Sequence, residues 1–587
     1  MRWVLAAMAA AWGVAAAVLF FGGISFRLGG LLVRSHSAIP ALTVAAVLTI
    51  VALVRRASAR EALEWWWDTI ERRGAVAALG FAALAVVIGV QWGTFAAGGS
   101  DSYCYLNQAE LFARGEVHDF EPFGADPQWP GTPGAFVPAG HSSVPARAGA
   151  MVPICPSGYP FMLAVAKKIF GRAAMFWVTP LMGGLAVWLT FVLGRTVGRG
   201  FRPGETTGGA TGLLASLLLL TSPIFVYQVV QPMNDVPATA LWCAALVIAS
   251  REGMNPLRRA AIAGLLAGAA LTVRPNLLPL AAVIGLWMMM RGPAIRAGLT
   301  YAAAMLPGVI FVLAAQAALY GSPLRSGYGD LSALFSLSHI GPNLSRYPRW
   351  VLDVQSPVVL LALTGPLVLR GELRRTGVWL LAFCAAVFAC YLPYVIFDDW
   401  WYQRFVLPAF PPLMALTAVA IVSFLVRLPP AARTIALGIV CSVFALVYVN
   451  RGIDREAFRL RDHEHRFRAA GEHVATLPQN AAIITGHQTG SIRFYSGRST
   501  VGWGDIPPGR LADAIDYLRR QGRKPYLLFE SWEEPNFRAR FPTDPLGSLA
   551  WPPTVEINRT VRIYDPDDYP KYMRGEFVPT ERIVTTK

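Results

Sequence analysis

GGSDSYCYLNQAELFARGE, from Gly98 to Glu116, joins an apolar segment at 74–95 to a large polar loop. The apolar segment is long enough to cross a lipid bilayer, so Asp101 is expected within a few residues of the membrane surface. Residues 102–113 are predicted to form a helix that ends at Gly115. Asp101 is a candidate functional carboxylate, although an Asp after two glycines is also typical of a helix N-cap.

The composition of the chain indicates an integral membrane protein. Hydrophobic residues make up 54% of its 587 residues, and charged residues make up 15%. The mean hydropathy of +0.44 means that the apolar surface exceeds what one soluble core could bury. The net charge of +16 does not indicate nucleic-acid binding, because most Arg residues lie between apolar segments, where they set orientation in the bilayer.

Apolar segments, many of roughly 20 residues, recur along the chain and predict about thirteen membrane crossings. They fall at 4–24, 38–54, 74–95, 173–194, 209–230, 236–250, 260–273, 276–290, 297–319, 356–370, 377–397, 405–426 and 432–449. The first segment follows a single Arg and contains small residues, which is compatible with a cleaved signal peptide. We expect instead that it is retained as the first helix.

Arginine clusters occupy alternate connections between these segments, and the positive-inside rule places those connections in the cytoplasm. The clusters lie at 55–73, 195–202, 251–259, 291–296, 370–375 and 427–433. The opposite connections, which include the loop at 96–172, then face outward. With an odd number of crossings, the chain after residue 450 lies on the same side as Asp101. The expected location is a plasma membrane, with an extracytoplasmic C-terminal domain.

Three regions are predicted from these patterns. Residues 1–73 hold two additional helices and a cytoplasmic loop, residues 74–450 form the transmembrane core, and residues 451–587 form a domain without a spanning segment. In that domain, helices are predicted at 462–477, 508–521 and 533–541, and strands at 481–485, 525–529, 554–558 and 561–564. This alternation favours a small α/β domain. The domain shows no phosphate-binding, metal-binding or nucleophile motif, so recognition or covering of the site is its expected role.

The six cysteines fall into two groups. Four lie in apolar segments, where they resemble small buried hydrophobic residues. Cys104 and Cys155 flank a long polar loop, so they are candidates for a disulfide if that loop faces an oxidising compartment.

Chemistry on the outer face requires an activated group that arrives on a lipid, because no nucleotide pool exists there. A sugar on polyprenyl phosphate meets this need, and its transfer requires a base for the acceptor's proton and cations for the phosphate. Asp101 is the predicted base. The cations predicted to bind the substrate are those that face outward: Lys167, Lys168, Arg274, Arg325 and Arg404. Arg suits this task because its planar fork can hold two phosphate oxygens.

Two further observations qualify these predictions. Each cation has an alternative role as an interfacial anchor, and this interpretation is stronger for Lys167 than for Arg274 or Arg404. Asp235, before a proline, is either a carboxylate at a helix start or a second carboxylate that orients the substrate. A divalent cation beside Asp398 is conceivable, but no ligand spacing indicates one, so no metal and no cofactor are expected.

Taken in order, these motifs resemble the GT-C superfamily of integral-membrane glycosyltransferases, in particular bacterial relatives of the protein mannosyltransferases and the lipid A aminoarabinose transferases. The motifs are DSYCYLNQAELFARGE, PSGYPFMLAVAKKIFG, QPMNDVP, GLLAGAALTVRPNLLPL, YGSPLRSGYG and YQRFVLPAFPPL, and the resemblance covers about residues 74–427. It implies a GT-C-type fold and a catalytic acidic residue in the first loop, which corresponds to Asp101. Many members have two adjacent acidic residues there, whereas Asp101 stands between Ser100 and Ser102.

The leading hypothesis is therefore an inverting glycosyltransferase that moves a sugar from a polyprenyl-phosphate donor to an acceptor hydroxyl, on a lipid, a glycan or a protein. One alternative is a polysaccharide polymerase or ligase with a lipid-diphosphate donor. Another is a lipid or solute transporter, which would place ionisable residues deep within helices. The charged residues of this chain cluster at helix ends instead.

Overall fold

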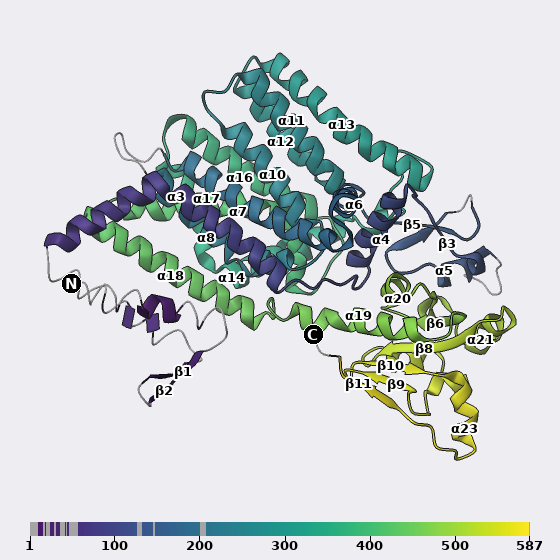
Figure 1. Ribbon diagram of the computed structural model, residues 1–587. Coiled ribbons are helices and arrows are strands. Elements are labelled where there is room, and N and C mark those ends of the chain that lie inside the picture. The colour runs from purple at the N-terminus through teal and green to yellow at the C-terminus, as the bar shows by residue number, and fades with distance from the viewer. Residues whose placement is uncertain are drawn as a thin grey trace.

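The computed structural model describes residues 57–585 except 126–131, 145–146 and 200–206, together with short stretches of the first 56 residues. Apolar helices form one large body, and a smaller α/β unit lies against one end of it (Figure 1). The membrane segments expected at 4–24 and 38–54 lie largely outside the described residues. Between them, β1 (Ile24–Leu28) and β2 (Leu31–Ser35) pair as an antiparallel hairpin.

The first long helix, α3 (Ala57–Gln91), is continuous over 35 residues. We predicted a cytoplasmic loop up to residue 73 and a membrane segment from residue 74. The stretch before residue 74 contains several Ala, Glu, Leu and Arg residues, which are strong helix formers, and contains no Gly or Pro between 57 and 73. The predicted boundary therefore lies inside one helix.

Seven helices in the described part of the chain are long and apolar enough to cross a membrane, and a bent pair makes eight at most. The seven are Arg60–Gln91, Arg172–Val197, Pro256–Val273, Ala294–Tyr320, Gly371–Tyr391, Trp400–Leu425 and Pro430–Asp454. The pair comprises α8 (Gly208–Leu220) and α9 (Pro223–Val229), which meet at a 64° bend where Pro223 interrupts the helix. The chain is thus a multi-pass membrane protein.

The expected count of about thirteen crossings is not confirmed. α10 (Asp235–Ser250) and α12 (Leu278–Met290) are apolar but short. The segment expected at 356–370 forms only η6 (Pro357–Leu363) and α15 (Gly365–Val368). Helices this short span a bilayer only where the lipid or the neighbouring protein adapts to them.

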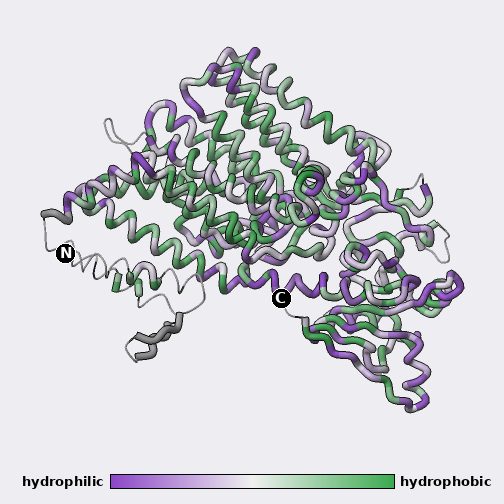
Figure 2. The backbone as a smooth tube through the Cα atoms, in the orientation of Figure 1, coloured by the Kyte–Doolittle hydropathy of each residue, from purple (hydrophilic) through white to green (hydrophobic). Residues whose placement is uncertain are grey.

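The helices differ in how much of their surface other helices cover. α17 (Phe410–Leu425) lies in the middle of the bundle, and 83% of the apolar 18-residue stretch of the span that contains it is buried inside the protein. By contrast, only 6% of the corresponding apolar stretch is buried in α13 (Ala294–Tyr320), and only 11% is buried in α18 (Pro430–Asp454). Hydrophobic residues dominate the helical body (Figure 2). The apolar outer faces of α13 and α18 are therefore available to lipid.

Close backbone contact holds α13 against α11 (Pro256–Val273). A Cβ atom added to Gly308 of α13 would lie 2.2 Å from the carbonyl oxygen of Gly268, and one added to Gly264 would lie 2.3 Å from that of Tyr301. Small residues allow this approach, as they do in many membrane helix pairs. The remaining membrane helices are α7 (Val178–Val197), which follows η2 (Arg172–Trp177), and α16 (Gly371–Tyr391).

The first large loop contains two helices and a small sheet. α4 (Asp101–Arg114) ends at Gly115, whose φ of 80° suits glycine, and α6 (Gly158–Phe170) returns the chain to the bundle. Between them, β3 (Asp119–Phe120), β5 (Ala150–Pro153) and β4 (His141–Ser143) pair in that order. Short turns of helix also occur at Pro122–Ala125 and Thr132–Ala135. A later loop carries η4 (Leu331–Ala333), η5 (Leu337–His339) and α14 (Ile340–Gln355).

The C-terminal unit is a six-stranded sheet with helices on both faces. The strand order is β11-β9-β10-β8-β6-β7, and β6 runs parallel to both β7 and β8. The strands are β6 (Ala481–Thr485), β7 (Ser499–Gly502), β8 (Lys524–Glu530), β9 (Val555–Ile557), β10 (Val561–Tyr564) and β11 (Glu581–Ile583). α19 (Leu460–Thr476) and α20 (Thr489–Ser496) pack on one face, and α21 (Leu511–Arg520) and α22 (Glu534–Arg540) pack on the other. A short helix, α23 (Tyr569–Met573), precedes β11.

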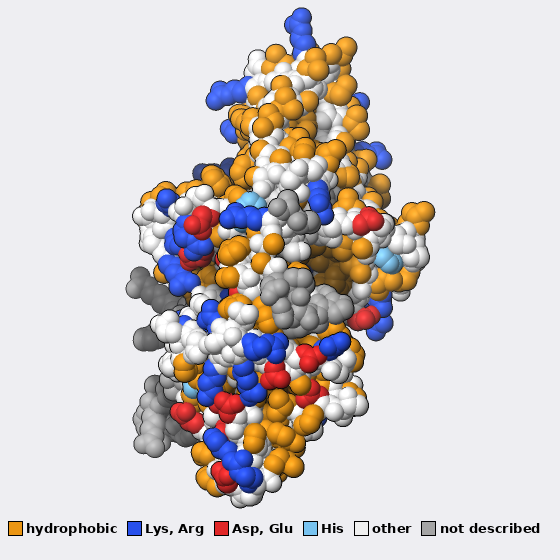
Figure 3. Space-filling view, turned by 90° about the vertical axis from the view of Figure 1, so that its right-hand side faces the viewer, with side chains coloured by type: hydrophobic (Ala, Val, Ile, Leu, Met, Phe, Trp, Pro, Cys, Tyr) orange, Lys and Arg blue, Asp and Glu red, His pale blue; other side chains and the backbone are white. Residues whose placement is uncertain are grey.

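Hydrogen bonds and an ion pair fix this unit to the first loop. Arg493 of α20 donates to a carboxylate oxygen of Glu121 at 2.6 Å, and both side chains are buried. The Tyr495 hydroxyl accepts a hydrogen bond from the backbone N–H of Ala97 at 2.9 Å. On the face drawn in Figure 3, hydrophobic side chains cover much of the upper, helical part, and charged side chains gather on the lower part, which is the C-terminal unit. The first loop and the C-terminal unit therefore lie at the same end of the bundle.

Candidate active site

Asp101 begins α4 but does not cap it. Ser100 occupies the N-cap position, and no side chain there accepts a hydrogen bond from the first turn. The Asp101 carboxylate instead accepts a hydrogen bond of 2.6 Å from Nη2 of Arg404, and its other oxygen lies 3.4 Å from the Ser100 hydroxyl. With 41% of its side chain exposed, Asp101 is accessible. The N-cap reading of this residue is therefore wrong.

Arg404 lies in η7 (Trp400–Ala409), the turn of helix that leads into α17. Its guanidinium is 5.6 Å from the ring centre of Tyr402 and 5.0 Å from that of Phe405. Besides contacting Asp101, it approaches a carboxylate oxygen of Asp235 at 4.0 Å. Its buried Nε has no hydrogen-bond partner in the described part of the chain. Arg404 thus retains an N–H donor that faces none of these protein groups.

Arg274 and Asp235 form a fully buried ion pair at the ends of two neighbouring helices. Nη2 of Arg274, at the C-terminus of α11, donates to Asp235 at 2.5 Å, and its Nε donates to Asn234 at 3.2 Å. Nη1 donates to the Tyr391 hydroxyl at 3.1 Å. Asp235 has no exposed surface, and the Arg274 side chain is 7% exposed. A buried charge is tolerated only when it is paired, and Arg274 pairs with Oδ1 of Asp235, whereas Oδ2 has no hydrogen-bond partner among the described residues.

Together, the four charged side chains form a chain of alternating sign in the order Asp101, Arg404, Asp235 and Arg274. Two carboxylates balance two guanidiniums, so the group carries no net formal charge. Asp235 does not line the adjacent cavity, whereas Asp101, Arg274 and Arg404 do. Asp235 was predicted to bind substrate; in the structure it is buried behind both arginines, and its role stays a prediction.

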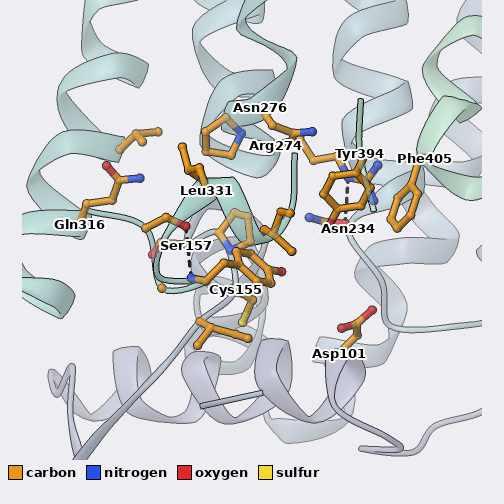
Figure 4. Close-up of a pocket in the computed structure, with 18 of the residues that line it drawn as sticks. Asp101, Cys155, Ser157, Asn234, Arg274, Asn276, Gln316, Leu331, Tyr394 and Phe405 are labelled. Carbon is orange, nitrogen blue, oxygen red and sulfur yellow. Dashed lines mark hydrogen bonds between the residues drawn. The ribbon is translucent and has the colours of Figure 1, made fainter. Parts of the chain in front are cut away.

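The charged group opens into a cavity of about 660 Å³. Figure 4 shows Gln316 and Leu331 across this cavity from Asp101 and Phe405. One wall of the cavity is polar, and the opposite wall is mostly apolar. The apolar wall comes from α13 and the loop after it, and it includes Phe311, Val312, Ala315, Leu331, Leu334 and Phe335. Because α13 is so little covered by other helices, a single helix separates this wall from the surrounding lipid.

The other predicted cations lie outside the charged group. Lys168 is exposed in the last turn of α6, and its neighbour Lys167 is paired with Glu110. Arg325 is exposed between two residues that line the cavity, Leu324 and Ser326, but does not line it itself. The structure therefore brings Arg274 and Arg404 together with Asp101, and it does not bring Lys168 or Arg325 there.

A disulfide ties the helix of Asp101 to the cavity wall. Cys104, one turn after Asp101, is bonded to Cys155, and their Cα atoms are 6.2 Å apart. Cys155 lines the cavity together with Pro156 and Ser157. Closing a loop of this length stabilises the folded state by about 4 kcal/mol in the chain-entropy model. The bond thus restrains the position of Asp101 relative to the cavity.

The residues described here include no group of three or more His, Cys, Asp or Glu side chains arranged to hold a metal ion. Asp398, considered above for a divalent cation, is 85% exposed and pairs with Arg346 at 2.5 Å. The absence of a cofactor stays a prediction.

Several polar residues of the cavity were not predicted, among them Asn276, Tyr391 and Tyr105. Asn276 donates to the Tyr391 hydroxyl at 3.0 Å, and both residues line the cavity beside Arg274. Tyr105, one turn after Asp101, also lines it. Burial raises the pKa of Tyr105 well above its usual value, so this phenol stays protonated and able to donate a hydrogen bond. Asn276 stands in the VRPN motif, which was a usable signal, whereas nothing in the sequence singles out Tyr391.

Comparison with known proteins agrees with this architecture. No protein-family model matches the sequence, and no curated protein matches it. Among solved structures, ArnT from Cupriavidus metallidurans bound to undecaprenyl phosphate is similar at 13% identity and a TM-score of 0.50, over 78% of this chain and 94% of ArnT. The oligosaccharyltransferase AglB from Archaeoglobus fulgidus, in complex with an inhibitory peptide and a dolichol-phosphate, has 10% identity and a TM-score of 0.47, over 80% and 72% of the two chains. The arabinofuranosyltransferase AftD from Mycobacteria has 15% identity and a TM-score of 0.41, over 78% and 35%.

At these identities, the likeness to ArnT shows the fold. The chain is a multi-pass membrane protein with a GT-C-type fold, as its sequence motifs predicted.

Proposed function

We propose that the protein is an inverting glycosyltransferase that takes a sugar from a polyprenyl-phosphate donor at the extracytoplasmic face of a bacterial plasma membrane. The observation that carries the proposal is the placement of Asp101 and two arginines on one wall of a cavity whose opposite wall is mostly apolar, with Gln316 and Tyr320 as polar exceptions. A lipid-linked phosphate has the same two parts, a charged group and an apolar chain. The fold shared with ArnT, whose structure contains undecaprenyl phosphate, supports this choice of donor.

The charges of the site suit a phosphate leaving group. The four charged side chains cancel, so an arriving phosphate finds no excess negative charge. Arg404 lines the cavity, and a phosphate oxygen can accept a hydrogen bond from its guanidinium. A phosphate bound to Arg404 also competes with Asp101 for that guanidinium. Donor binding would then release the carboxylate to act as a base.

The reaction then needs two bond changes that the site can assist. The acceptor oxygen bonds to the anomeric carbon and loses its proton to Asp101. The bond from that carbon to the phosphate oxygen breaks, and the electron pair stays on the phosphate. Arg404 and Arg274 stabilise the negative charge that develops there. Attack from the face opposite the leaving phosphate inverts the configuration of the sugar.

Location of the charges favours this function over transport. Asp235 begins α10, Arg274 follows the last residue of α11, and Arg404 precedes α17. Asp235 and Arg274 lie at helix ends, and Arg404 lies near the start of the span Trp400–Leu425, whereas a transporter of this type would place such residues near the middle of the membrane.

Asp101→Asn tests the proposal. The amide keeps the size of the side chain but cannot take a proton, so sugar transfer should fall by about 100- to 10,000-fold. The matched control is Glu116→Gln, which neutralises an exposed carboxylate just beyond the other end of α4. The assay follows labelled sugar released from an undecaprenyl-monophosphate donor and, in parallel, from a lipid-diphosphate donor. Full activity of Asp101→Asn would contradict the proposal, and use of the diphosphate donor alone would favour the polymerase or ligase.

A further inference from the structure

The carboxyl ends of β6 and β8 in the C-terminal unit lie at a switch point of the sheet topology, a position where ligands often bind. The chain leaves β6 through α20, on one face of the sheet, to reach β7. It then crosses through α21, on the other face, to reach β8, on the opposite side of β6. Open α/β sheets bind ligands where successive connections leave to opposite faces in this way. The proposed function assigns no task to the carboxyl ends of β6 and β8.

A single buried carboxylate organises the side chains at this switch point. Glu530, the last residue of β8, is 4% exposed and accepts hydrogen bonds from four side chains. His487 Nδ1 and Arg466 Nε donate at 3.2 and 3.0 Å, and Gln488 Nε2 and the Trp532 indole N–H donate at 3.1 and 2.8 Å. Burial opposes ionisation of Glu530, but the hydrogen bond from His487 and the charge of Arg466 lower its pKa to about 2. It is therefore an anion that holds its donors in place.

The two rings that donate to Glu530, His487 and Trp532, are open to solvent. Trp532 is 57% exposed, and the His487 side chain is 38% exposed. Their ring centres are 5.7 Å apart, and the rings meet edge to face. Since Nδ1 donates to a carboxylate, Nε2 of His487 is left to bond with a ligand. An exposed indole fixed by a buried carboxylate is costly for a protein surface, and such preorganisation is typical of binding sites.

His487 lies directly beside the start of the loop that carries Asp101. Nε2 of His487 is 3.7 Å from the position that a Cβ atom on Gly99 would occupy, two residues before Asp101. Glu464 and Phe467 of α19 pack so closely on Gly98 that a Cβ atom there would lie 2.0 Å from Glu464 Oε2. A molecule bound on His487 and Trp532 would therefore border the residues that carry Asp101.

We propose that His487 and Trp532 form the acceptor-binding surface, and that the acceptor is a neutral glycan. The inference rests on the proposed function and names its acceptor. The indole face suits the C–H face of a sugar ring, and the imidazole nitrogen suits its hydroxyl groups. Three carboxylates near the two rings, Glu464, Glu530 and Glu533, outnumber Arg466 and disfavour an anionic acceptor. An acyl chain would need a continuous apolar surface, which these polar neighbours do not provide.

The first test is binding, which requires no chemistry. The full-length protein in detergent is titrated with fluorescently labelled neutral hexasaccharides of mannose, galactose and arabinose, and polarisation is measured. We expect at least one hexasaccharide to bind, and Trp532→Ala to weaken it about 10- to 30-fold. Trp532→Phe, which keeps an aromatic face, should recover most of the affinity. Trp65→Ala is the matched control, because Trp65 is 58% exposed but lies on α3.

The second test is transfer from labelled undecaprenyl-phosphate sugar to the hexasaccharide that binds. Trp532→Ala and His487→Gln should raise the KM for the hexasaccharide and leave the KM for the donor unchanged. Unchanged binding and acceptor KM in both variants would overturn the inference, and so would transfer only to a Ser/Thr peptide or to diacylglycerol. Hexasaccharide binding that depends on Trp532, without any release of sugar that depends on Asp101, would instead refute the proposed function and keep the binding surface.

Discussion

Asp235 is the residue whose replacement tests the architecture of the charged group. It has no exposed surface and lies 2.5 Å from Arg274 and 4.0 Å from Arg404. Asp235→Asn preserves the shape of the side chain but removes the negative charge between the two guanidiniums. Arg274 then loses its ion-pair partner, and Arg404 retains only Asp101.

The expected cost follows from burial and distance. At an effective dielectric constant of 20, opposite charges 4 Å apart attract by about 4 kcal/mol, and closer charges attract more. In the native protein, part of this attraction is offset by the cost of removing the Asp235 carboxylate from water, and Asp235→Asn avoids that cost. Removing one partner of a buried pair typically destabilises a protein by about 3–5 kcal/mol, because the other charge stays buried. We expect Asp235→Asn to cost this much and to reduce sugar transfer.

The measurement is unfolding in mixed detergent micelles, followed as SDS is added. Asp398→Asn is the matched control, because Asp398 also pairs with an arginine at 2.5 Å but is 85% exposed. Its loss should cost less than about 1 kcal/mol. The double variant Asp235→Asn with Arg274→Met removes both buried charges, so it should be more stable than the sum of the single changes indicates. Its transfer activity should stay low, because the phosphate has lost one of its arginines.

Comparable stability of Asp235→Asn and Asp398→Asn would refute this reasoning. It would mean that water or another group satisfies Arg274 and Arg404, and that the two arginines do not depend on Asp235. A double variant as unstable as the summed single changes would refute the coupling alone.

Three further predictions concern the surroundings of the site. Cys104→Ser, or reduction of the bond to Cys155, should lower stability by about 4 kcal/mol, and an unchanged melting temperature would contradict this. Gly308→Ala should separate α13 from α11, destabilise the protein by about 1–3 kcal/mol and reduce transfer, whereas Gly438→Ala, where an added Cβ meets nothing within 4 Å, should not. Burial lowers the pKa of His141 to about 3, so stability present above pH 6.5 is lost as the pH falls toward 3. His141→Gln should flatten this dependence in thermal unfolding.

The membrane architecture could be predicted from the sequence because hydropathy acts locally. Each expected apolar segment that lies within the described residues corresponds to a helix, a bent pair of helices or a short helical turn. The number of crossings could not be predicted in this way, because it depends on tilt and on contacts between helices. Pro223 shows the difficulty, since one apolar stretch at 209–230 becomes two helices at an angle of 64°.

The C-terminal unit shows the same division. Strands at 481–485 and 561–564 were predicted at the residues where they occur, since both are short runs rich in apolar residues and are almost fully buried. α20 and β7 were not predicted. Their sequence, TGSIRFYSGRSTVG, has few apolar residues, and their positions are fixed instead by contacts with the first loop, such as that between Arg493 and Glu121.

For the candidate site, the sequence predicted that its residues lie at one common end of the helix bundle, and the side of the membrane stays a prediction. The positive-inside rule placed Asp101, Arg274 and Arg404 in outward-facing connections, and the structure indeed brings them to one end of the bundle. It placed Lys168 and Arg325 there as well, and charge alone cannot separate the two pairs. The separation depends on Asp235, which can be buried without exposed surface only if cations surround it. The sequence predicts that a carboxylate begins α10. It does not predict which arginines contact that carboxylate, because this depends on how α10, α11 and η7 pack together.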